Sequence, residues 1–158
     1  MSEFSSPEPE QIVVMDDLVE EVCWQLLAGS RFGRIAFVVD GAPLVLPFNF
    51  RVHGETLVFR CAASSMLHGL GRGSPVAVEI DHVDVAAETG WSVMLRGEAW
   101  EITDRSDAVD KLGDSVHAWA PGDRDRWLSV TRGAVSGRSI SRRSTDWRPP
   151  FRTSSLDT

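Results

Sequence analysis

The spacing of apolar residues near the start of the chain is that of an amphipathic helix. Acidic residues Asp16 and Asp17 come first, where the helix dipole favours negative charge, and Gly29 is a stop signal. The pattern predicts a helix over about residues 16–28. Residues 1–11 are polar, contain two prolines and are expected to be disordered. Six apolar residues carry the three- and four-residue spacing of the helix: Leu18, Val19, Val22, Cys23, Leu26 and Leu27.

The pattern then changes to short apolar runs separated by turn residues, which is typical of antiparallel strands. Asp40-Gly41 and the turn around Gly54 separate the first three runs. Pro47 has no amide proton, so its strand should be bulged or lie at a sheet edge. Gly97 predicts a bulge or the close approach of another backbone. The expected strands are 33–39, 44–52, 56–60, 75–81 and 91–102, with a last strand or pair over 127–131 and 135–140; residues 82–90 are expected to form a loop.

Two further helices are expected between the strands. A short helix over residues 64–70 would have Ser64 or Ser65 as its N-cap, and a longer one would run from Asp104 or Ser106 to about Ala118. Meandering short strands with few helices indicate a mainly β, antiparallel barrel rather than a βαβ layer fold. A chain of 158 residues suggests one compact domain, placed at residues 12–140, with a basic tail over residues 141–158.

Charge is unevenly distributed along the chain. Residues 131–158 carry a formal charge of +4, whereas the chain as a whole carries −7, so the other 130 residues carry −11. So acidic a body argues against nucleic acid as a partner. The basic tail could be solvated, or it could contact a partner subunit, a phosphate ligand or nucleic acid. The chain has neither a membrane-spanning apolar run nor a signal-peptide pattern, so we expect a cytoplasmic protein without a membrane partner.

Common catalytic motifs are absent. The sequence has no Gly-x-Gly-x-x-Gly, Walker loop, His-Glu-x-x-His or Cys-x-x-Cys motif, and its four histidines show no metal-ligand spacing. We therefore expect no metal site and assign no catalytic residue. Cys23 and Cys61 are expected to be buried thiols.

The stretch "FRCAASSMLHGL", residues 59–70, contains the most informative junction. An apolar strand ends at Arg60, and Ser64 and Ser65 follow at the expected start of a helix. Unpaired N–H groups at a helix N-terminus, two hydroxyls and a guanidinium would form a phosphate cradle. Alternatively, the serines only cap the helix and Arg60 pairs with an acid.

Aromatic residues mark two other candidate regions. Phe48 and Phe50 lie on one face of their strand and Asn49 on the other, so a planar heterocycle could lie along the strand, or the two rings could simply belong to the core. Trp91 begins a strand and Trp119 follows a helix. Tryptophans in such places can face a ligand or a partner subunit, or pack beneath loops.

Taken together, these motifs resemble the flavin-binding split-barrel proteins related to pyridoxamine 5′-phosphate oxidase, of the small actinobacterial kind. The resemblance covers about residues 15–140. It rests on the order of seven segments, "CWQLL", "GRIA", "PFNF", "LVFRCA", "VAVEID", "WSVMLRG" and "WAPG".

The resemblance implies a six-stranded antiparallel split β-barrel that forms a homodimer with two FMN molecules at the subunit interface. The strand at residues 47–50 would lie near the flavin ring, and the junction at residues 59–67 would hold the phosphate. The cofactor-binding residues implied within one chain are Pro47, Phe48, Asn49, Phe50, Phe59, Arg60, Cys61, Ala62, Ser64, Ser65, Met66 and Leu67. The partner chain would contribute Trp91, Ser92 and Trp119.

The function that the resemblance implies is an FMN-dependent oxidoreductase acting on an unknown small molecule. In many relatives a lysine stands where this chain has Met66, so one phosphate contact is lost. The alternatives are a reductase that uses the deazaflavin F420, and a non-enzymatic protein that binds flavin or haem. Oxidation of pyridoxamine phosphate itself is the least favoured reaction, since no arginine/histidine pair for the substrate phosphate is evident near the C-terminus.

Overall fold

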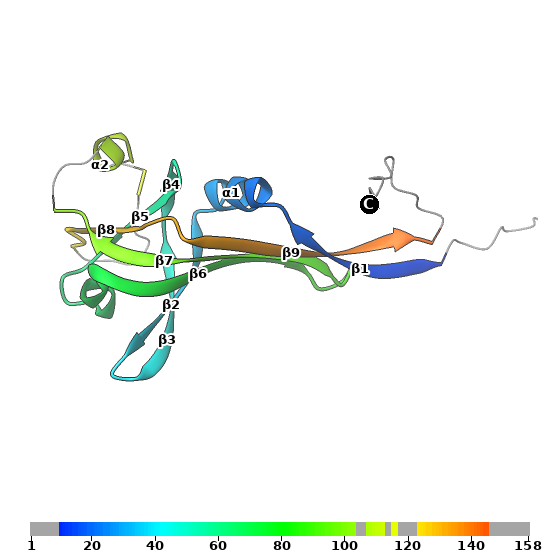
Figure 1. The fold of residues 1–158 in the computed structure, drawn as a ribbon, viewed down its shortest axis with the longest axis horizontal. Helices are drawn as coiled ribbons and strands as arrows, with labels where there is room; N and C mark the ends of the chain where they lie inside the picture. The colour runs from blue at the N-terminus through cyan, green and yellow to red at the C-terminus, as the bar shows by residue number, and fades with distance from the viewer. Residues whose placement is uncertain (1–9, 104–106, 113–114, 117–122, 146–158) are drawn as a thin grey trace, which may run out of the picture.

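The protein is mainly β, with one antiparallel sheet and few helices (Figure 1). The computed structural model describes residues 10–103, 107–112, 115–116 and 123–145. Within them the strand order is β3-β2-β6-β7-β8-β5-β4, and β9 pairs with both β7 and β1. The strands are β1 (Gln11–Leu18), β2 (Phe32–Val39), β3 (Ala42–Asn49), β4 (Arg51–His53), β5 (Thr56–Cys61), β6 (Arg72–Asp84), β7 (Thr89–Glu101), β8 (Arg126–Val130) and β9 (Ala134–Ser144). The helices are α1 (Glu20–Gly29), the 3₁₀ helix η1 (Met66–Leu70) and α2 (Asp107–Leu112).

The two ends of this strand order are joined by a single residue. Strand β3 ends at Asn49 and β4 begins at Arg51, so only Phe50 separates the two end strands. The sheet therefore curls back on itself, and Phe50 is fully buried inside the curl. Among the described residues β3 pairs with β2 alone, which confirms that Pro47 lies in an edge strand.

The described residues form nine strands, against the six or seven that the sequence pattern predicts. Two differences account for most of the excess: the expected strand 44–52 divides at Phe50, and residues 11–18 form a strand. The prediction of a helix from residue 16 is therefore wrong for its first turn. Residues 11–18 pair along their whole length with β9, and Asp16 and Asp17 form ion pairs with Arg143 and Arg138. Pairing with a strand more than 100 residues away thus overrides the local helical spacing.

Local turn chemistry agrees better with expectation. Asp40 and Gly41 both have positive φ angles, 50° and 79°, as a tight two-residue hairpin requires. At Gly97 an added β-carbon would lie 2.2 Å from the backbone oxygen of Thr131, which confirms the predicted close approach. The expected loop over residues 82–90 is wrong, because β6 continues to Asp84 and β7 begins at Thr89.

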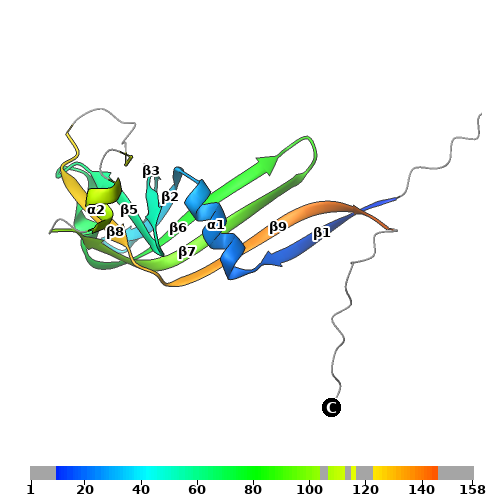
Figure 2. The same cartoon turned by 90° about the horizontal axis from the view of Figure 1, so that it is seen from above.

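Two strand pairs extend from the curled region. Figure 2 shows the β6–β7 hairpin and the β1–β9 pair diverging from it, with α1 lying across the sheet between them. Helix α1 packs Cys23 and Leu27 into the core, where both are fully buried. The last four residues of β9, up to Ser144, belong to the segment that the sequence marked as a tail.

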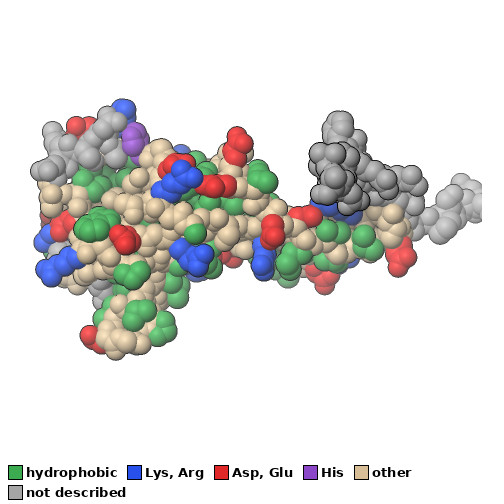
Figure 3. All heavy atoms as spheres, viewed as in Figure 1, with side chains coloured by type: hydrophobic (Ala, Val, Ile, Leu, Met, Phe, Trp, Pro, Cys, Tyr) green, Lys and Arg blue, Asp and Glu red, His purple; other side chains and the backbone are tan. Residues whose placement is uncertain are grey.

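The surface carries several exposed apolar side chains, including some on the projecting β2–β3 hairpin (Figure 3). Val38 and Val45 lie on this hairpin and are 65% and 59% exposed. None of the described helices is both long enough and apolar enough to span a bilayer.

Candidate functional site

A small pocket lies where the ends of β3 and β5 meet the segment before β8. Its volume is about 110 Å³. The lining residues come from five segments: Pro47, Phe48, Asn49, Arg60, Leu67, Val116 and Arg124. Five of these seven, all but Val116 and Arg124, are residues that the sequence marked for a cofactor.

An aromatic cluster fixes the β3 side of the pocket. The Phe48 and Phe50 rings stack with centroids 5.2 Å apart, and Phe48 meets Phe59 edge to face, also at 5.2 Å. All three rings are buried, so the reading of Phe48 and Phe50 as core residues is confirmed. Because side chains alternate along a strand, this packing turns Asn49 to the opposite side, where it lines the pocket.

Arg60 is held in place by two contacts that leave most of its guanidinium available. Its Nε donates to the carbonyl oxygen of Arg124 at 2.8 Å, and the group lies 5.0 Å from the Trp127 ring centre. The alternative that Arg60 pairs with an acid is wrong for the described part of the chain, where it forms no ion pair. Its two terminal nitrogens have no protein partner there, so they can donate to an anion in the pocket.

The turn after β5 differs from the expected helix. Residues 66–70 form a short 3₁₀ helix, so the dipole of a full α-helix does not contribute to an anion site. Ser64 is exposed, while the Ser65 amide donates to the Ala62 carbonyl at 3.0 Å. The Ser65 hydroxyl is buried and has no nitrogen or oxygen partner in the described chain, so neither serine caps η1. The Met66 side chain lies outside the described part of the structure.

Cys61 follows the pocket residue Arg60 on β5 and is fully buried. Burial raises the pKa of its thiol, opposed in part by a hydrogen bond with the Ser65 hydroxyl and by the charges of Arg124 and Arg126. The thiol is therefore neutral near pH 7 and fills space beside the cations without adding negative charge. The expectation of a buried thiol is confirmed, and it holds for Cys23 as well.

Trp91 and Ser92 lie in another part of the molecule. They line a second pocket of about 320 Å³, whose apolar wall includes Met15, Val83 and Ile140. Within one chain these two residues are thus separate from the Arg60 pocket. Trp119 lies outside the described residues.

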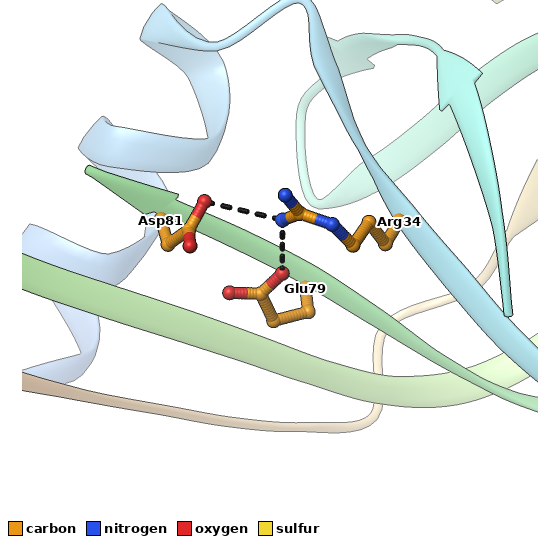
Figure 4. Close-up of polar contacts among 3 residues, drawn as sticks. All are labelled: Arg34, Glu79 and Asp81. Atoms are coloured by element: carbon orange, nitrogen blue, oxygen red, sulfur yellow. Dashed lines mark hydrogen bonds and ion pairs between the residues drawn. The ribbon is translucent and has the colours of Figure 1, made fainter. Parts of the chain in front are cut away.

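An ion cluster borders this second pocket (Figure 4). Arg34 on β2 reaches across to two carboxylates on β6, at 3.0 Å from Glu79 and 3.2 Å from Asp81. Hydrogen bonds to Asp81 and then Glu79 raise the pKa of Arg34. Arg34 and Asp81 are exposed to water and Glu79 is partly exposed, so the cluster defines the charge of this surface more than the stability of the fold.

Sequence reasoning missed Arg124 and Val116 as lining residues. Arg124 belongs to the charged run Asp123-Arg124-Asp125-Arg126, which has no periodic pattern. Only the pairing of β5 with β8, which places Cys61 opposite Arg126, brings this run to the pocket. The alternating charges immediately before a strand were the one available signal.

Comparisons with known proteins agree with this architecture. The model of the pyridoxamine 5′-phosphate oxidase family matches residues 19–142. The uncharacterized protein Rv0080 of Mycobacterium tuberculosis is 28% identical over 141 residues, which cover 86% of this chain and 91% of that protein.

Two solved structures share the fold. An FAD-binding protein of Mycobacterium smegmatis is 30% identical, with a TM-score of 0.62 over 80% of this chain and 98% of the other. An FAD-binding protein of Mesorhizobium loti is 22% identical, with a TM-score of 0.66 over 82% of this chain and 98% of the other.

The curled antiparallel sheet and its pocket thus define a split-barrel protein. The chain belongs to the pyridoxamine 5′-phosphate oxidase family, whose model spans most of its length.

Proposed function

We propose that the protein binds a flavin nucleotide, with the phosphate nearest the ribityl chain in the Arg60 pocket. The observation that carries this proposal is the convergence of Arg60 and Arg124 with Asn49 at one small cavity. Volumes of about 300–1,000 Å³ are typical of sites that enclose whole ligands. A cavity of about 110 Å³ suits a phosphate group and leaves the ring outside, along the edge strand β3.

The residues present fit such a phosphate even without a lysine at Met66. Two arginines line the pocket, the buried Ser65 hydroxyl has no nitrogen or oxygen partner, and the neutral Cys61 thiol adds no repulsion. Arg60 would donate through its terminal nitrogens while its Nε keeps the Arg124 backbone in place. A bound flavin supplies the redox chemistry, and this chain supplies binding, orientation and electrostatics.

We further propose that the protein acts as a homodimeric oxidoreductase on a small molecule. The outer sheet face of the two arms exposes Val13, Met15, Val83, Met94 and Ile140, which are between 38% and 62% exposed. We call these five residues the arm face. Apolar side chains clustered in this way are typical of protein interfaces. Ser92 lies on this face, whereas Trp91 shares the core side of β7 with Val93 and Leu95. A second copy on the arm face would therefore bring Ser92 toward the open side of its partner's flavin ring.

Reconstitution tests the flavin proposal directly. The purified chain is mixed with FMN, passed over a desalting column and read by visible absorption. Retained flavin bands, and turnover with NADH or NADPH, are the expected results. If the chain is mixed with micromolar FMN and the desalted protein shows no flavin absorption bands, the proposal is contradicted.

Subunit mixing tests the shared site. Arg60→Met and Ser92→Ala would each weaken flavin binding in a homodimer. A mixed dimer of the two variants contains one site with both changes and one with neither, so mixing should restore tight binding at one site in two. No restoration in dimers verified by sedimentation would show that Ser92 does not act across the interface.

A further inference from the structure

A second pair of arginines lies beside the Arg60 pocket. Arg51 on β4 pairs with Val58 on β5, two residues before Arg60, so the side chains of Arg51 and Arg60 lie on one face of the sheet. Arg31 is the neighbour of residues 49–51, because its carbonyl oxygen accepts from the Phe50 amide at 3.2 Å and from the Asn49 side-chain amide at 3.5 Å. Asn49 thus separates two cationic groups, Arg60 with Arg124 and Arg51 with Arg31.

The guanidinium of Arg51 has few hydrogen-bond acceptors within the protein. Its Nη1 donates to the Phe50 carbonyl at 2.7 Å, while its Nε is buried without a partner. A buried donor that lacks an acceptor is costly, and few native structures keep one without a reason.

The neighbouring charge is of the same sign. Burial, and then the charge of Arg31, lower the pKa of Arg51. Within the described ranges neither arginine forms an ion pair with an acid. Two close cations without a counter-ion repel each other, and an anion between them would relieve this repulsion and the missing bonds.

We infer that Arg31 and Arg51 form a second phosphate subsite, so that the protein takes a flavin dinucleotide in preference to a mononucleotide. This inference rests on the proposed function, since the first phosphate must occupy the Arg60 pocket. The two phosphates of a dinucleotide are adjacent, which matches two cationic groups on either side of Asn49. The adenylate arm then leaves past Arg31, which is exposed.

Isothermal titration of the full chain with FMN and with FAD tests the inference. Wild-type protein should bind FAD about ten- to a hundredfold more tightly than FMN, the gain expected from one or two charged hydrogen bonds. Arg51→Met should weaken FAD binding by about tenfold or more and change FMN binding by less than about twofold.

Two further variants provide a second readout and a charge control for this test. Because Arg51 is half-buried, Arg31→Met provides the same readout from an exposed position and should also weaken FAD selectively. Arg72→Met removes a charge from an exposed site on β6 and should change neither constant. Circular dichroism checks that each variant folds.

The outcomes separate this inference from the function on which it rests. If the wild type bound neither FMN nor FAD, both the proposed flavin function and the second subsite would be contradicted. FMN binding with no preference for FAD, or an equal loss of both flavins in Arg31→Met and Arg51→Met, would overturn the second subsite alone.

Discussion

Replacing Arg60 by methionine should weaken flavin binding by about ten- to a hundredfold. Methionine keeps an unbranched side chain, shorter than that of arginine, and removes the charge and all N–H donors. In the structure Nε already donates to the Arg124 carbonyl. The hydrogen bonds to the flavin phosphate that the substitution removes are therefore those of the two terminal nitrogens, at the pocket that Arg60 lines. A hydrogen bond to a charged group contributes about 1.5–3 kcal/mol, and each 1.4 kcal/mol is tenfold in affinity.

The same change should also destabilise the fold slightly. The guanidinium stacks near Trp127, a contact of about 0.5–1 kcal/mol at exposed sites. For a domain of this size about 1 kcal/mol corresponds to roughly 2–4 °C in melting temperature. A fall of a few degrees in the flavin-free protein is therefore expected, and it does not account for a tenfold change in affinity well below the transition.

Fluorescence quenching of FMN, titrated with each variant at fixed ionic strength, measures the effect. Arg60→Lys retains the charge without the planar fork and should fall between wild type and Arg60→Met. Arg72→Met is the control for net charge. An unchanged FMN dissociation constant in Arg60→Met would refute the assignment of this pocket to the phosphate.

Three other changes have expected outcomes. Met66→Lys should tighten FMN binding by about tenfold through an added charged contact, and titration showing an unchanged constant would place the phosphate elsewhere. Gly97→Ala should lower the free energy of unfolding in urea by about 1–3 kcal/mol, because its β-carbon would lie 2.2 Å from a backbone oxygen. Gly29→Ala, where nothing lies within 4 Å, is the matched control, and equal losses in both would contradict the packing argument. Stability should decline as the pH rises above 9.0, the ordinary thiol value, because burial raises the pKa of Cys23 and Cys61 only in the folded state. The double alanine variant should show a shallower decline in urea titrations between about pH 7 and 10, and an identical slope would rule out the thiols as its cause.

Local chemistry made part of the fold predictable from the sequence. Pro47 lacks an amide proton, Asp40-Gly41 suits positive φ, and Gly97 has no β-carbon, so each limits the backbone regardless of what lies far away. These positions were predicted correctly. The alternation of Phe48, Asn49 and Phe50 likewise predicted two buried rings on one face and the amide on the other, and the structure adds that the Phe48 ring also lines the pocket.

Features that depend on distant partners were not predictable in this way. The segment before α1 has helical spacing, yet it is a strand because β9 offers a complete set of backbone partners. Arg124 reaches the pocket only through the pairing of β5 with β8. The serine junction was expected to present a helix N-terminus, but only five residues follow in a 3₁₀ helix, whose hydrogen-bond geometry is poorer.

The most direct test of the account compares FMN with riboflavin, which has the same ring and no phosphate. Isothermal titration of the wild-type chain should give one FMN per chain and a riboflavin dissociation constant at least about tenfold higher, since the arginines of the pocket act on the phosphate alone. Equal affinity for the two, or heat of binding from neither, would contradict the claim that this pocket holds a flavin phosphate.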